Sequence, residues 1–524
     1  MMQLIIGKKT AYNTAYKLWL GLSSLGKSCG FSKASFYLER LVPNHATAHI
    51  HNRYVPFEQN TKLTKKHTMK IDLNELYSAK RFGKKNTTKS GDPRSEFQRD
   101  FDRIIFSSAF RRLQNKTQVF PLPGSVFVHN RLTHSLEVAS VGRSLGNLIG
   151  QVIFEKYKDE LTEESKDFYR YSFYNVIASA CLCHDIGNPA FGHSGEDAIA
   201  SYFIKNKTEL KSKFSDEEWA DLVNFEGNAN AIRVLTQQQN GKSEGGLKLT
   251  FSTLSCIAKY PCESIGKDKK FIHRKKFGFF QSEKMTFMEI AEETQMIKDD
   301  ANPLIYFRHP FVWLVEAADD ICYNIIDFED AHRLGIVEHS KCVELLQSLV
   351  SCIGTQNYDE IDIQLQKITD RNDRVSYLRA KAISALTMKA KSIYENNIES
   401  FLNGTFKKPI FDVIKEDCGA LSKILEFSIE NIYNNRNVVE IENAGYNVMY
   451  ELLSHFIPPI LKQEDNRTQS DKKALKLLPP AFNYDGDTIY KRVLGVLDYV
   501  AGMTDNYATD FFKRIKGIEI GMKI

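Results

Sequence analysis

The sequence predicts an all-α protein with at most a small β-hairpin. Apolar residues recur at helical spacing over most of the chain after Met69, whereas strand-like alternation is rare. The composition, 42% hydrophobic and 26% charged, is ordinary for a soluble globular protein. With 524 residues, the chain is long enough to bury a large core without the help of cross-links.

Residues 1–68 differ from the rest of the chain. They are basic and polar, with scattered aromatic residues and no sustained periodicity, whereas a clearer segment begins at Met69. A weak apolar stretch at residues 18–22 lacks the cleavage region of a signal peptide. We therefore expect an N-terminal extension that is either poorly ordered or not part of the native protein.

Two short extended pieces are expected next, at residues 118–123 and 125–129, with a hairpin around Pro123-Gly124 as one arrangement. A helix should follow from about Leu132 to about Tyr157, because apolar residues recur along it at Leu136, Val141, Leu145, Leu148 and Val152. This helix carries His134 in its first turn.

A second helix is predicted over residues 173–184. Its apolar side chains fall on one face, at Phe173, Val176, Ile177, Ala180 and Cys181. His184 continues this stripe and should face the interior at the end of the helix. Gly187 and Pro189 are typical of a helix stop.

A third helix is predicted over residues 311–326, and Asp319 borders its apolar stripe. Carboxylates near a buried face are rare unless they are paired or bind a metal. The lysine-rich stretches 267–276 and 462–473 interrupt the helical pattern, so we expect surface loops there.

Cysteine usage, charge and hydropathy narrow the class of protein. The nine cysteines form no Cys-x-x-Cys pair and suggest no disulfide framework, which favours a reducing cytoplasm. A formal net charge of only +5 argues against a dedicated nucleic-acid binder, although a local basic patch is compatible with it. No apolar run approaches the length of a membrane span, so we expect no membrane partner.

Four side chains from three segments form a metal-ligand pattern: His134, the pair His184–Asp185, and Asp319. Two imidazoles and two carboxylates suit a borderline or hard divalent cation, and we expect Mn²⁺, Mg²⁺ or Fe²⁺, with Zn²⁺ also compatible. Such a cation polarises phosphates and lowers the pKa of a bound water. The pattern therefore points to metal-assisted hydrolysis.

The order of a distant His, then His-Asp, then a distant Asp resembles the HD-domain superfamily. A longer set of segments resembles the deoxyguanosine triphosphate triphosphohydrolases (dGTPases), from about Tyr77 to about Lys513. These segments are residues 110–119, 131–138, 184–196, 224–228 and 498–505. The resemblance implies an HD-type helical core with additional C-terminal helices.

The resemblance also implies a reaction. Water attacks the α-phosphorus of a deoxynucleoside triphosphate (dNTP), dGTP first among them, and releases a deoxynucleoside and tripolyphosphate. Relatives of this kind form homo-oligomers such as hexamers, and some respond to a second dNTP that acts as an activator. The implied division is a catalytic core at residues 69–345 and a helical region at 346–524 that completes the nucleotide pocket and the subunit contacts.

The resemblance assigns proton transfer to His193 and its orientation to Glu196. If the segment is helical, the two share a face, and a carboxylate beside an imidazole raises its basicity. The alternative is a helix-capping cluster. Arg131, three residues before His134, and Lys259 are candidates for phosphate contacts, against the alternative of solvated surface charges.

Five further residues form the expected sugar and base pocket. By resemblance, Gln118 hydrogen-bonds the 3′-hydroxyl and Val119 packs where a ribose 2′-hydroxyl would sit, which costs on the order of 1–3 kcal/mol for a ribonucleotide. Tyr323 and Asp327 share a helix face with Asp319, and the resemblance places them near the phosphates and the 3′-hydroxyl. Asn228 is a weaker candidate for the pocket lining. The alternative is that Val119 is an ordinary core residue and that Tyr323 and Asp327 belong to a surface stripe of their helix.

Two other functions stay open at the level of sequence. An HD phosphodiesterase acting on cyclic or oligonucleotide substrates would share the metal ligands but would not need Gln118 and Val119. A catalytically weak dNTP sensor is the second alternative. The lysines of residues 267–276 would suit a second nucleotide or single-stranded DNA, or simply solvated loop charge.

Overall fold

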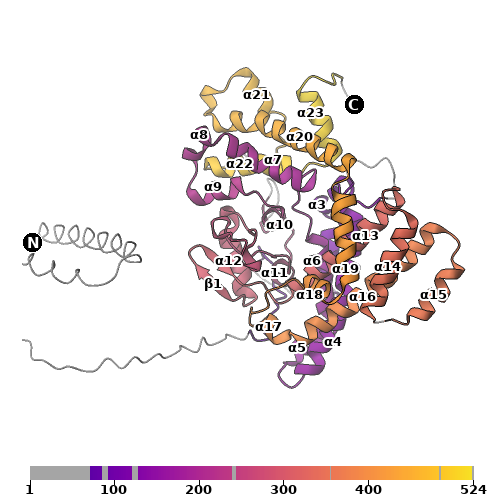
Figure 1. The fold of residues 1–524 in the computed structure, drawn as a ribbon. Helices are drawn as coiled ribbons and strands as arrows, with labels where there is room; N and C mark the ends of the chain where they lie inside the picture. Colours follow the sequence, from indigo (N-terminus) through magenta and orange to yellow (C-terminus); the bar gives the residue numbers. More distant parts are fainter. Residues whose placement is uncertain are drawn as a thin grey trace, which may run out of the picture. The chain divides into compact units, whose positions relative to one another are not determined.

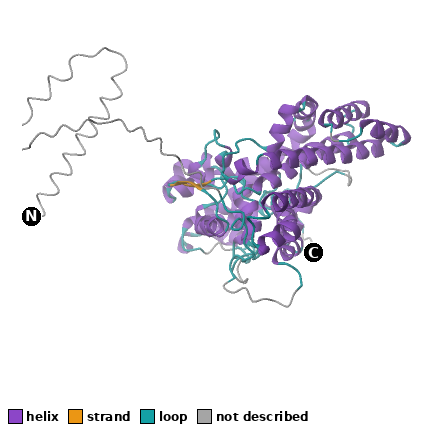
Figure 2. Ribbon diagram, turned by 90° about the horizontal axis from the view of Figure 1, so that it is seen from below, coloured by secondary structure: helices purple, strands orange, loops and turns teal. Residues whose placement is uncertain are grey.

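The computed structural model describes residues 71–84, 93–120, 128–238, 244–354, 356–482 and 486–521. By its contacts the chain divides into one unit at residues 1–66 and another at 67–524, and the description below concerns the second. The predicted N-terminal extension lies outside the described residues. Figure 2 shows that helices dominate and that one short pair of strands is present, which confirms the predicted all-α class.

The first half of the described chain contains short helices around two long ones. Its helices are α2 (Glu96–Ile105), α3 (Ser108–Arg112), α4 (Arg131–Tyr157), α5 (Glu163–Asp167), α6 (Phe173–Cys183), α7 (Gly192–Lys205), α8 (Lys207–Leu210), α9 (Asp216–Val223), α10 (Gly227–Thr236), α11 (Phe251–Cys256), α12 (Lys284–Glu293) and α13 (Val312–Arg333). The predicted helices at 132–157, 173–184 and 311–326 are confirmed as α4, α6 and α13, and α13 continues seven residues further than its stripe suggested.

The second half adds the remaining helices. They are α14 (His339–Ile353), α15 (Tyr358–Lys367), α16 (Arg371–Asn396), α17 (Ile398–Leu402), α18 (Ile410–Asp417), α19 (Gly419–Ser428), α20 (Arg436–Leu461), α21 (Gln469–Leu475), α22 (Ile489–Ala501) and α23 (Asp505–Ile515). In Figure 1, α20–α22 lie beside α7–α9, whereas α14, α16 and α19 gather around α13. Two large apolar clusters correspond to these two groups of helices.

Helices α4 and α6 pack unusually closely because α4 presents three glycines at four-residue spacing. A Cβ atom at Gly142 would lie 2.4 Å from the Cys181 sulfur, and one at Gly146 would lie 2.8 Å from the Tyr174 Cα. At Gly150 it would lie 2.3 Å from a backbone oxygen of α6's preceding turn. Any larger residue would force the helices apart. This close packing fixes the first turn of α4 relative to the end of α6.

The β-hairpin lies elsewhere than predicted. Strands β1 (Lys298–Ala301) and β2 (Leu304–Tyr306) pair antiparallel, whereas residues 118–120 form no strand and residues 121–127 lie outside the described residues. Next to the expected position, Thr117 and Asn130 make a single isolated bridge. The sequence of β1 gives no strand signal, because its four residues are all exposed and show no apolar alternation.

The prediction of surface loops is confirmed for residues 267–276, which contain only a short 3-10 turn, but it is wrong for part of 462–473. Helix α21 begins at Gln469, and Thr468 forms a capping box with Asp471 at its start. Such a box satisfies two otherwise free amide groups and stabilises a helix despite its polar surface.

The expectation of no disulfide is also wrong. Cys352 of α14 and Cys418 before α19 form a disulfide, with a Cα–Cα distance of 6.0 Å. Their separation of 66 residues carries no sequence signature. The other cysteines in the described part of the chain are free and buried.

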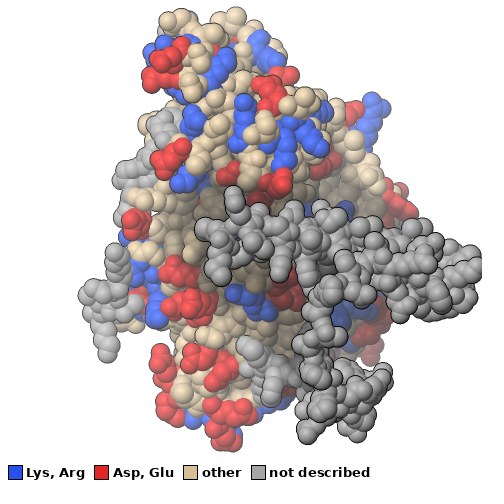
Figure 3. Space-filling model, turned by 90° about the vertical axis from the view of Figure 1, so that its left-hand side faces the viewer, with Lys and Arg blue, Asp and Glu red and all other residues tan. Residues whose placement is uncertain are grey.

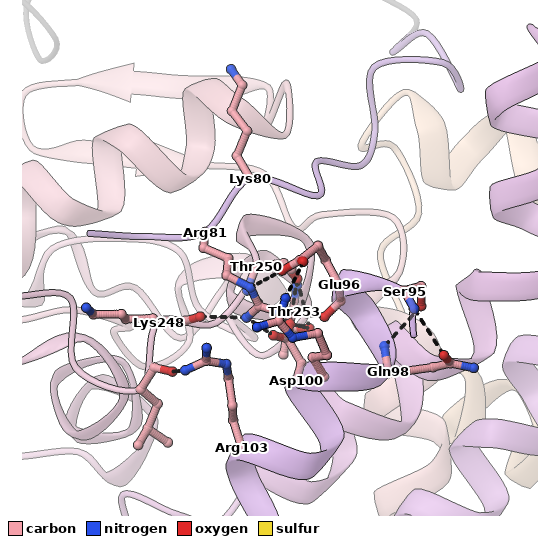
Figure 4. Close-up of polar contacts among 12 residues, drawn as sticks. Lys80, Arg81, Ser95, Glu96, Gln98, Asp100, Arg103, Lys248, Thr250 and Thr253 are labelled. Carbon is pink, nitrogen blue, oxygen red and sulfur yellow. Dashed lines mark hydrogen bonds and ion pairs between the residues drawn. The ribbon is translucent and has the colours of Figure 1, made fainter. Parts of the chain in front are cut away.

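A buried ion network joins the first described segment to the helical core (Figure 4). Arg81 binds Glu96 and, at 2.6 Å, Asp100 of α2. The second carboxylate oxygen of Asp100 accepts hydrogen bonds from the Thr250 amide at 3.0 Å and from the Thr253 hydroxyl at 2.8 Å. Each buried charge therefore has partners, as a stable interior requires.

No described helix combines the length and apolar character needed to cross a bilayer. On the face seen in Figure 3, Lys and Arg side chains alternate with Asp and Glu rather than forming a single basic sheet.

Candidate metal centre and substrate cavity

Three predicted metal ligands converge from three helices. His134 lies in the first turn of α4, which Asn130 caps by accepting hydrogen bonds from two backbone amides. His184 follows the last residue of α6, and Asp319 lies in the middle of α13. Both α6 and α13 pack against α4. The helix packing therefore gathers residues that are far apart in sequence.

The nitrogen and oxygen atoms of this cluster lie at distances that one cation can bridge. Asp319 Oδ1 is 3.2 Å from His134 Nε2 and 3.3 Å from His184 Nε2. One ligand atom from each of the three residues lies within 4.8 Å of the other two. All three donors are of the kind that divalent metals such as Mn²⁺ or Fe²⁺ accept.

The tautomer of His184 supports a metal site. Its Nδ1 is 2.7 Å from the Cys181 carbonyl oxygen, so Nδ1 carries the proton and donates it. Nε2 therefore faces the cluster, 3.3 Å from Asp319 Oδ1, and it is buried without a hydrogen bond of good geometry among the described residues. Buried polar atoms of this kind are rare in proteins unless something outside the chain satisfies them. The residues therefore fit a divalent cation.

The fourth predicted ligand, Asp185, lies beside the cluster rather than within it. Its Oδ2 is 3.6 Å from His184 Nε2, but the same oxygen accepts a hydrogen bond from Arg131 at 2.5 Å. Asn188 Nδ2 donates to its Oδ1 at 2.6 Å. Burial works against ionisation of Asp185, but the nearby Arg131 and His184 outweigh it and lower its pKa to about 2.

Lys259 contacts the cluster directly. Its ammonium group lies 2.7 Å from Asp319 Oδ2, whereas the two histidines contact Oδ1. Burial disfavours the charge of Lys259, but the Asp319 carboxylate holds its pKa above the usual value. The predicted alternative of a solvated surface charge is therefore wrong for this lysine, which is largely buried.

A cavity of about 190 Å³ adjoins Arg131 and contains five of the predicted site residues. They are Gln118, Val119, Arg131, His193 and Tyr323. Two buried polar atoms among them, Gln118 Oε1 and Arg131 Nε, have no hydrogen-bond partner among the described residues. Buried polar atoms without a partner are uncommon in folded proteins, so both residues mark the cavity as a candidate site.

His193 and Glu196 both lie on α7, as predicted, but they do not pair as expected. Glu196 Oε1 accepts a hydrogen bond from the Gly227 amide at 2.7 Å. The pKa of His193 is lowered rather than raised, because of partial burial and the nearby cations Lys276 and Arg131. Burial and the neighbouring Glu226 raise the pKa of Glu196 to about 8. Glu196 therefore anchors the start of α10 instead of making His193 more basic.

Comparison with known proteins agrees with this geometry. The chain matches the HD domain over residues 131–249 and the phosphohydrolase-associated domain over residues 415–514. A deoxyguanosinetriphosphate triphosphohydrolase-like protein of Synechocystis is 36% identical over 460 residues, which cover 86% of this chain and 100% of that protein. A protein of the same description from Pseudomonas aeruginosa is 36% identical, with 85% of this chain and 99% of its own length covered. The deoxyguanosinetriphosphate triphosphohydrolase of Salmonella typhimurium is 29% identical, with 81% and 94% covered.

The chain belongs to the dGTPase-like family of HD-domain phosphohydrolases. Its HD domain contains His134, His184 and Asp185, whereas Asp319 follows that domain on α13. Metal-binding groups from separate helices thus form one compact cluster. An HD domain together with this cluster implies a divalent metal.

Two predicted pocket residues of this phosphohydrolase do not line the cavity. Asp327 is buried and accepts a hydrogen bond from the Tyr433 hydroxyl at 3.3 Å. Burial and the nearby Asp330 hold the pKa of Asp327 well above its usual range. The Asn228 side chain donates to Glu226 at 2.7 Å instead of facing the cavity.

The associated domain contributes residues that the sequence did not reveal. Tyr433, Val438 and Glu442 complete the cavity wall, and the Tyr433 ring stacks on Tyr323 with centroids 5.6 Å apart. These residues come from the end of a π-helical turn and the first part of α20. No local pattern distinguishes them from other helix-face residues, because only the tertiary fold brings them to the HD domain.

A glycine permits the close approach of the two cavity walls. Phe191 and Gly192 adopt left-handed conformations, with φ of 60° and 55°, where the chain turns into α7. A Cβ atom at Gly192 would lie 2.8 Å from the Arg131 guanidinium. Because glycine has no side chain, Arg131 can lie over the start of α7 and reach both Asp185 and the cavity.

Proposed function

We propose that this HD phosphohydrolase hydrolyses dGTP, and other dNTPs as further substrates, to a deoxynucleoside and tripolyphosphate. The observation that carries the proposal is the link between the His134–His184–Asp319 cluster and the cavity lined by Gln118 and His193. Arg131 makes this link, because it lines the cavity and also binds Asp185, which lies 3.6 Å from His184.

His134, His184, Asp185 and Asp319 would hold the divalent cation, Mn²⁺, Mg²⁺ or Fe²⁺. When bound, this cation would neutralise charge on the phosphates and lower the pKa of a nearby water. Arg131 already lies between Asp185 and the cavity, which is the position from which a guanidinium would bind an anionic phosphate. Lys259 would balance the charge of the ligand set.

Proton transfer would fall to His193. Water adds to the α-phosphorus, the bond from phosphorus to the 5′-oxygen breaks, and the departing oxygen takes up a proton. His193 lines the cavity and is not one of the cluster residues, so it can transfer that proton while all metal ligands stay in place. Glu196 would support it indirectly, by fixing the Gly227 turn beside α7.

The sugar would bind between the two domains. Gln118 would donate to or accept from the 3′-hydroxyl, and Val119 would leave a 2′-hydroxyl without a partner. Tyr323 would pack beside the nucleotide, and Asp327 and Asn228 would act only through their contacts to Tyr433 and Glu226. The C-terminal region would complete the pocket through Tyr433 and α20.

The family resemblance also bears on the assembly and the cellular role of the protein. We propose a cytoplasmic homo-oligomer, such as a hexamer, that adjusts dNTP pools and can respond to a dNTP activator or single-stranded DNA. Positive and negative side chains are interspersed on the face shown in Figure 3, and this pattern gives little support to binding of single-stranded DNA there.

The products decide the matter. The purified protein is incubated with each dNTP and with Mn²⁺ or Mg²⁺, and phosphorus NMR follows the products. Tripolyphosphate supports the proposal, whereas pyrophosphate or orthophosphate would indicate another nucleotidase. No turnover, even with a second dNTP present, would favour the sensor, and cleavage of cyclic or oligonucleotide substrates alone would favour the phosphodiesterase. His134→Ala should abolish turnover, whereas His339→Ala on α14 should leave it intact.

A further inference from the structure

Asp505 is a buried carboxylate that joins two separate parts of the cavity wall. It is 1% exposed and stands at the first position of α23. Its Oδ2 accepts hydrogen bonds from both the amide, at 2.8 Å, and the hydroxyl of Thr117. Its Oδ1 accepts one from the Phe191 amide at 3.0 Å.

These contacts are not part of ordinary helix capping. The residue that caps α23 is Thr504, whose hydroxyl accepts a hydrogen bond from the Tyr507 amide. The Asp505 carboxylate instead accepts hydrogen bonds from Thr117 and Phe191, which are 388 and 314 residues away in the chain. A buried charge with this arrangement is costly unless each hydrogen bond is kept.

Asp505 joins the segment that we propose to select the sugar to the segment that positions the proposed proton donor, His193. Thr117 directly precedes the sugar-reading pair Gln118 and Val119. Phe191 holds the left-handed turn that aims α7, and therefore His193, at the cavity. Left-handed backbone is unfavourable for a phenylalanine, so an external hydrogen bond to its amide helps to hold it.

A neighbouring lysine makes a second link at the same place. The Lys116 ammonium donates to the Asn188 carbonyl, in the turn before Phe191, and to the Ala501 carbonyl at the end of α22. Lys116 and Thr117 are adjacent, so the segment with Gln118 and Val119, the turn before α7 and the α22–α23 junction meet at this place. Residues of the associated domain therefore contact both the Lys116–Thr117 segment and the turn at Phe191.

We infer that Asp505 is a positioning residue, which fixes the Gln118–Val119 segment relative to His193 and thereby sets the discrimination between deoxyribose and ribose. This inference rests on the proposed function. Val119 can exclude a 2′-hydroxyl only if its distance from the reacting phosphate is held, and Asp505 is the group that spans the two sides. Without it, the segment can shift away from α7 and make room for the extra hydroxyl.

Asp505→Asn is the test variant because it keeps size and shape. The amide offers one oxygen and one NH₂ group, so it can accept from only one of the two segments and opposes a donor at the other. Asp471→Asn is the matched control. Asp471 is also buried, at 8% exposed, and also accepts hydrogen bonds from an amide and a hydroxyl, both of Thr468, but it lies at the start of α21 and contacts no cavity residue.

The measurement is kcat and KM for dGTP and GTP, with thermal unfolding and metal content recorded alongside. We expect the ratio of kcat/KM for dGTP to that for GTP to fall roughly tenfold or more in Asp505→Asn, because a charged buried hydrogen bond is lost. Metal content should not change, and Asp471→Asn should keep the wild-type ratio. Thr117→Val, which removes only the hydroxyl donor, should give a smaller change in the same direction.

An equal loss of activity on dGTP and GTP in Asp505→Asn, matched by Asp471→Asn, would overturn the inference. Hydrogen–deuterium exchange supplies a readout that needs no turnover. Peptides covering residues 117–119 and 188–193 should both exchange faster in Asp505→Asn and not in Asp471→Asn, and unchanged exchange would also overturn it. If the wild-type protein releases no tripolyphosphate, the proposed function is wrong. The exchange experiment still tests whether Asp505 holds the two segments in place.

Discussion

Replacing Arg233 by methionine should break a buried ion pair between the HD domain and the associated domain. Arg233 of α10 binds Asp498 of α22 with two parallel contacts, Nε to Oδ1 at 2.7 Å and Nη2 to Oδ2 at 2.8 Å. Its Nη1 binds Glu283 at 2.6 Å. The three side chains are each no more than 7% exposed, so solvent screens these contacts little.

The size of the effect follows from what the variant leaves behind. Methionine fills much of the same space, but it leaves Asp498 and Glu283 buried without their counter-charge. Removing one partner of a buried ion pair costs about 3–5 kcal/mol. Burial raises the pKa of Glu283 even in the intact protein, so its protonation would relieve part of the strain at low pH. We therefore expect a loss of about 3–5 kcal/mol at pH 7.

Urea unfolding followed by circular dichroism measures this loss, with the metal kept at a fixed concentration. Arg436→Met is the control, because Arg436 is 89% exposed in its pair with Glu440 and its replacement should cost no more than about 0.5 kcal/mol. Adding Asp498→Leu to Arg233→Met should restore part of the stability, since it removes a stranded charge. A loss below about 1 kcal/mol for Arg233→Met would refute the reasoning.

Three other outcomes follow from the site and its surroundings. His193→Ala should lower kcat by about 10²–10⁴-fold while the metal stays bound, and near-normal turnover would remove His193 from the mechanism. The wild type should prefer dGTP to GTP, Val119→Ala should narrow that preference about tenfold, and equal wild-type rates would contradict the exclusion of ribose. Although burial works against its charge, His129 has its pKa raised to about 10 by Asp330 and Glu137, which lie 2.8 and 3.2 Å away. Its contribution, on the order of 2–3 kcal/mol after screening, should be full below pH 6.5 and lost as the pH rises through about 10. The difference in melting temperature between the wild type and His129→Gln should therefore shrink from pH 6 to pH 10, and a constant difference would contradict the assignment.

The helices that carry the metal cluster could be predicted because their buried apolar residues recur at helical spacing. Helices α4, α6 and α13 each show this periodicity, although nearly all of α6 is buried. Strand β1 has no buried residue and left no such trace. Helix α21 was hidden by its lysines, although the capping box of Thr468 and Asp471 was a readable signal.

The site shows where sequence reasoning ends. His134, His184 and Asp319 were predictable because metal donors beside apolar stripes are unusual. The partner of Glu196 was not, because it is a backbone amide, and every residue except proline has one. The residues from α20 were not predictable either, because the position of one helix against a domain 200 residues away depends on the whole packing.

Anomalous X-ray diffraction from crystals grown with Mn²⁺ would test the central claim most directly. We expect one strong peak at about 2.0–2.3 Å from His134 Nε2, His184 Nε2 and Asp319 Oδ1, with an Asp185 oxygen completing the set. We also expect the peak to be missing in His184→Ala crystals. A Mn²⁺ ion bound only elsewhere, or a wild-type protein without such a peak that still hydrolyses dNTPs, would contradict the account.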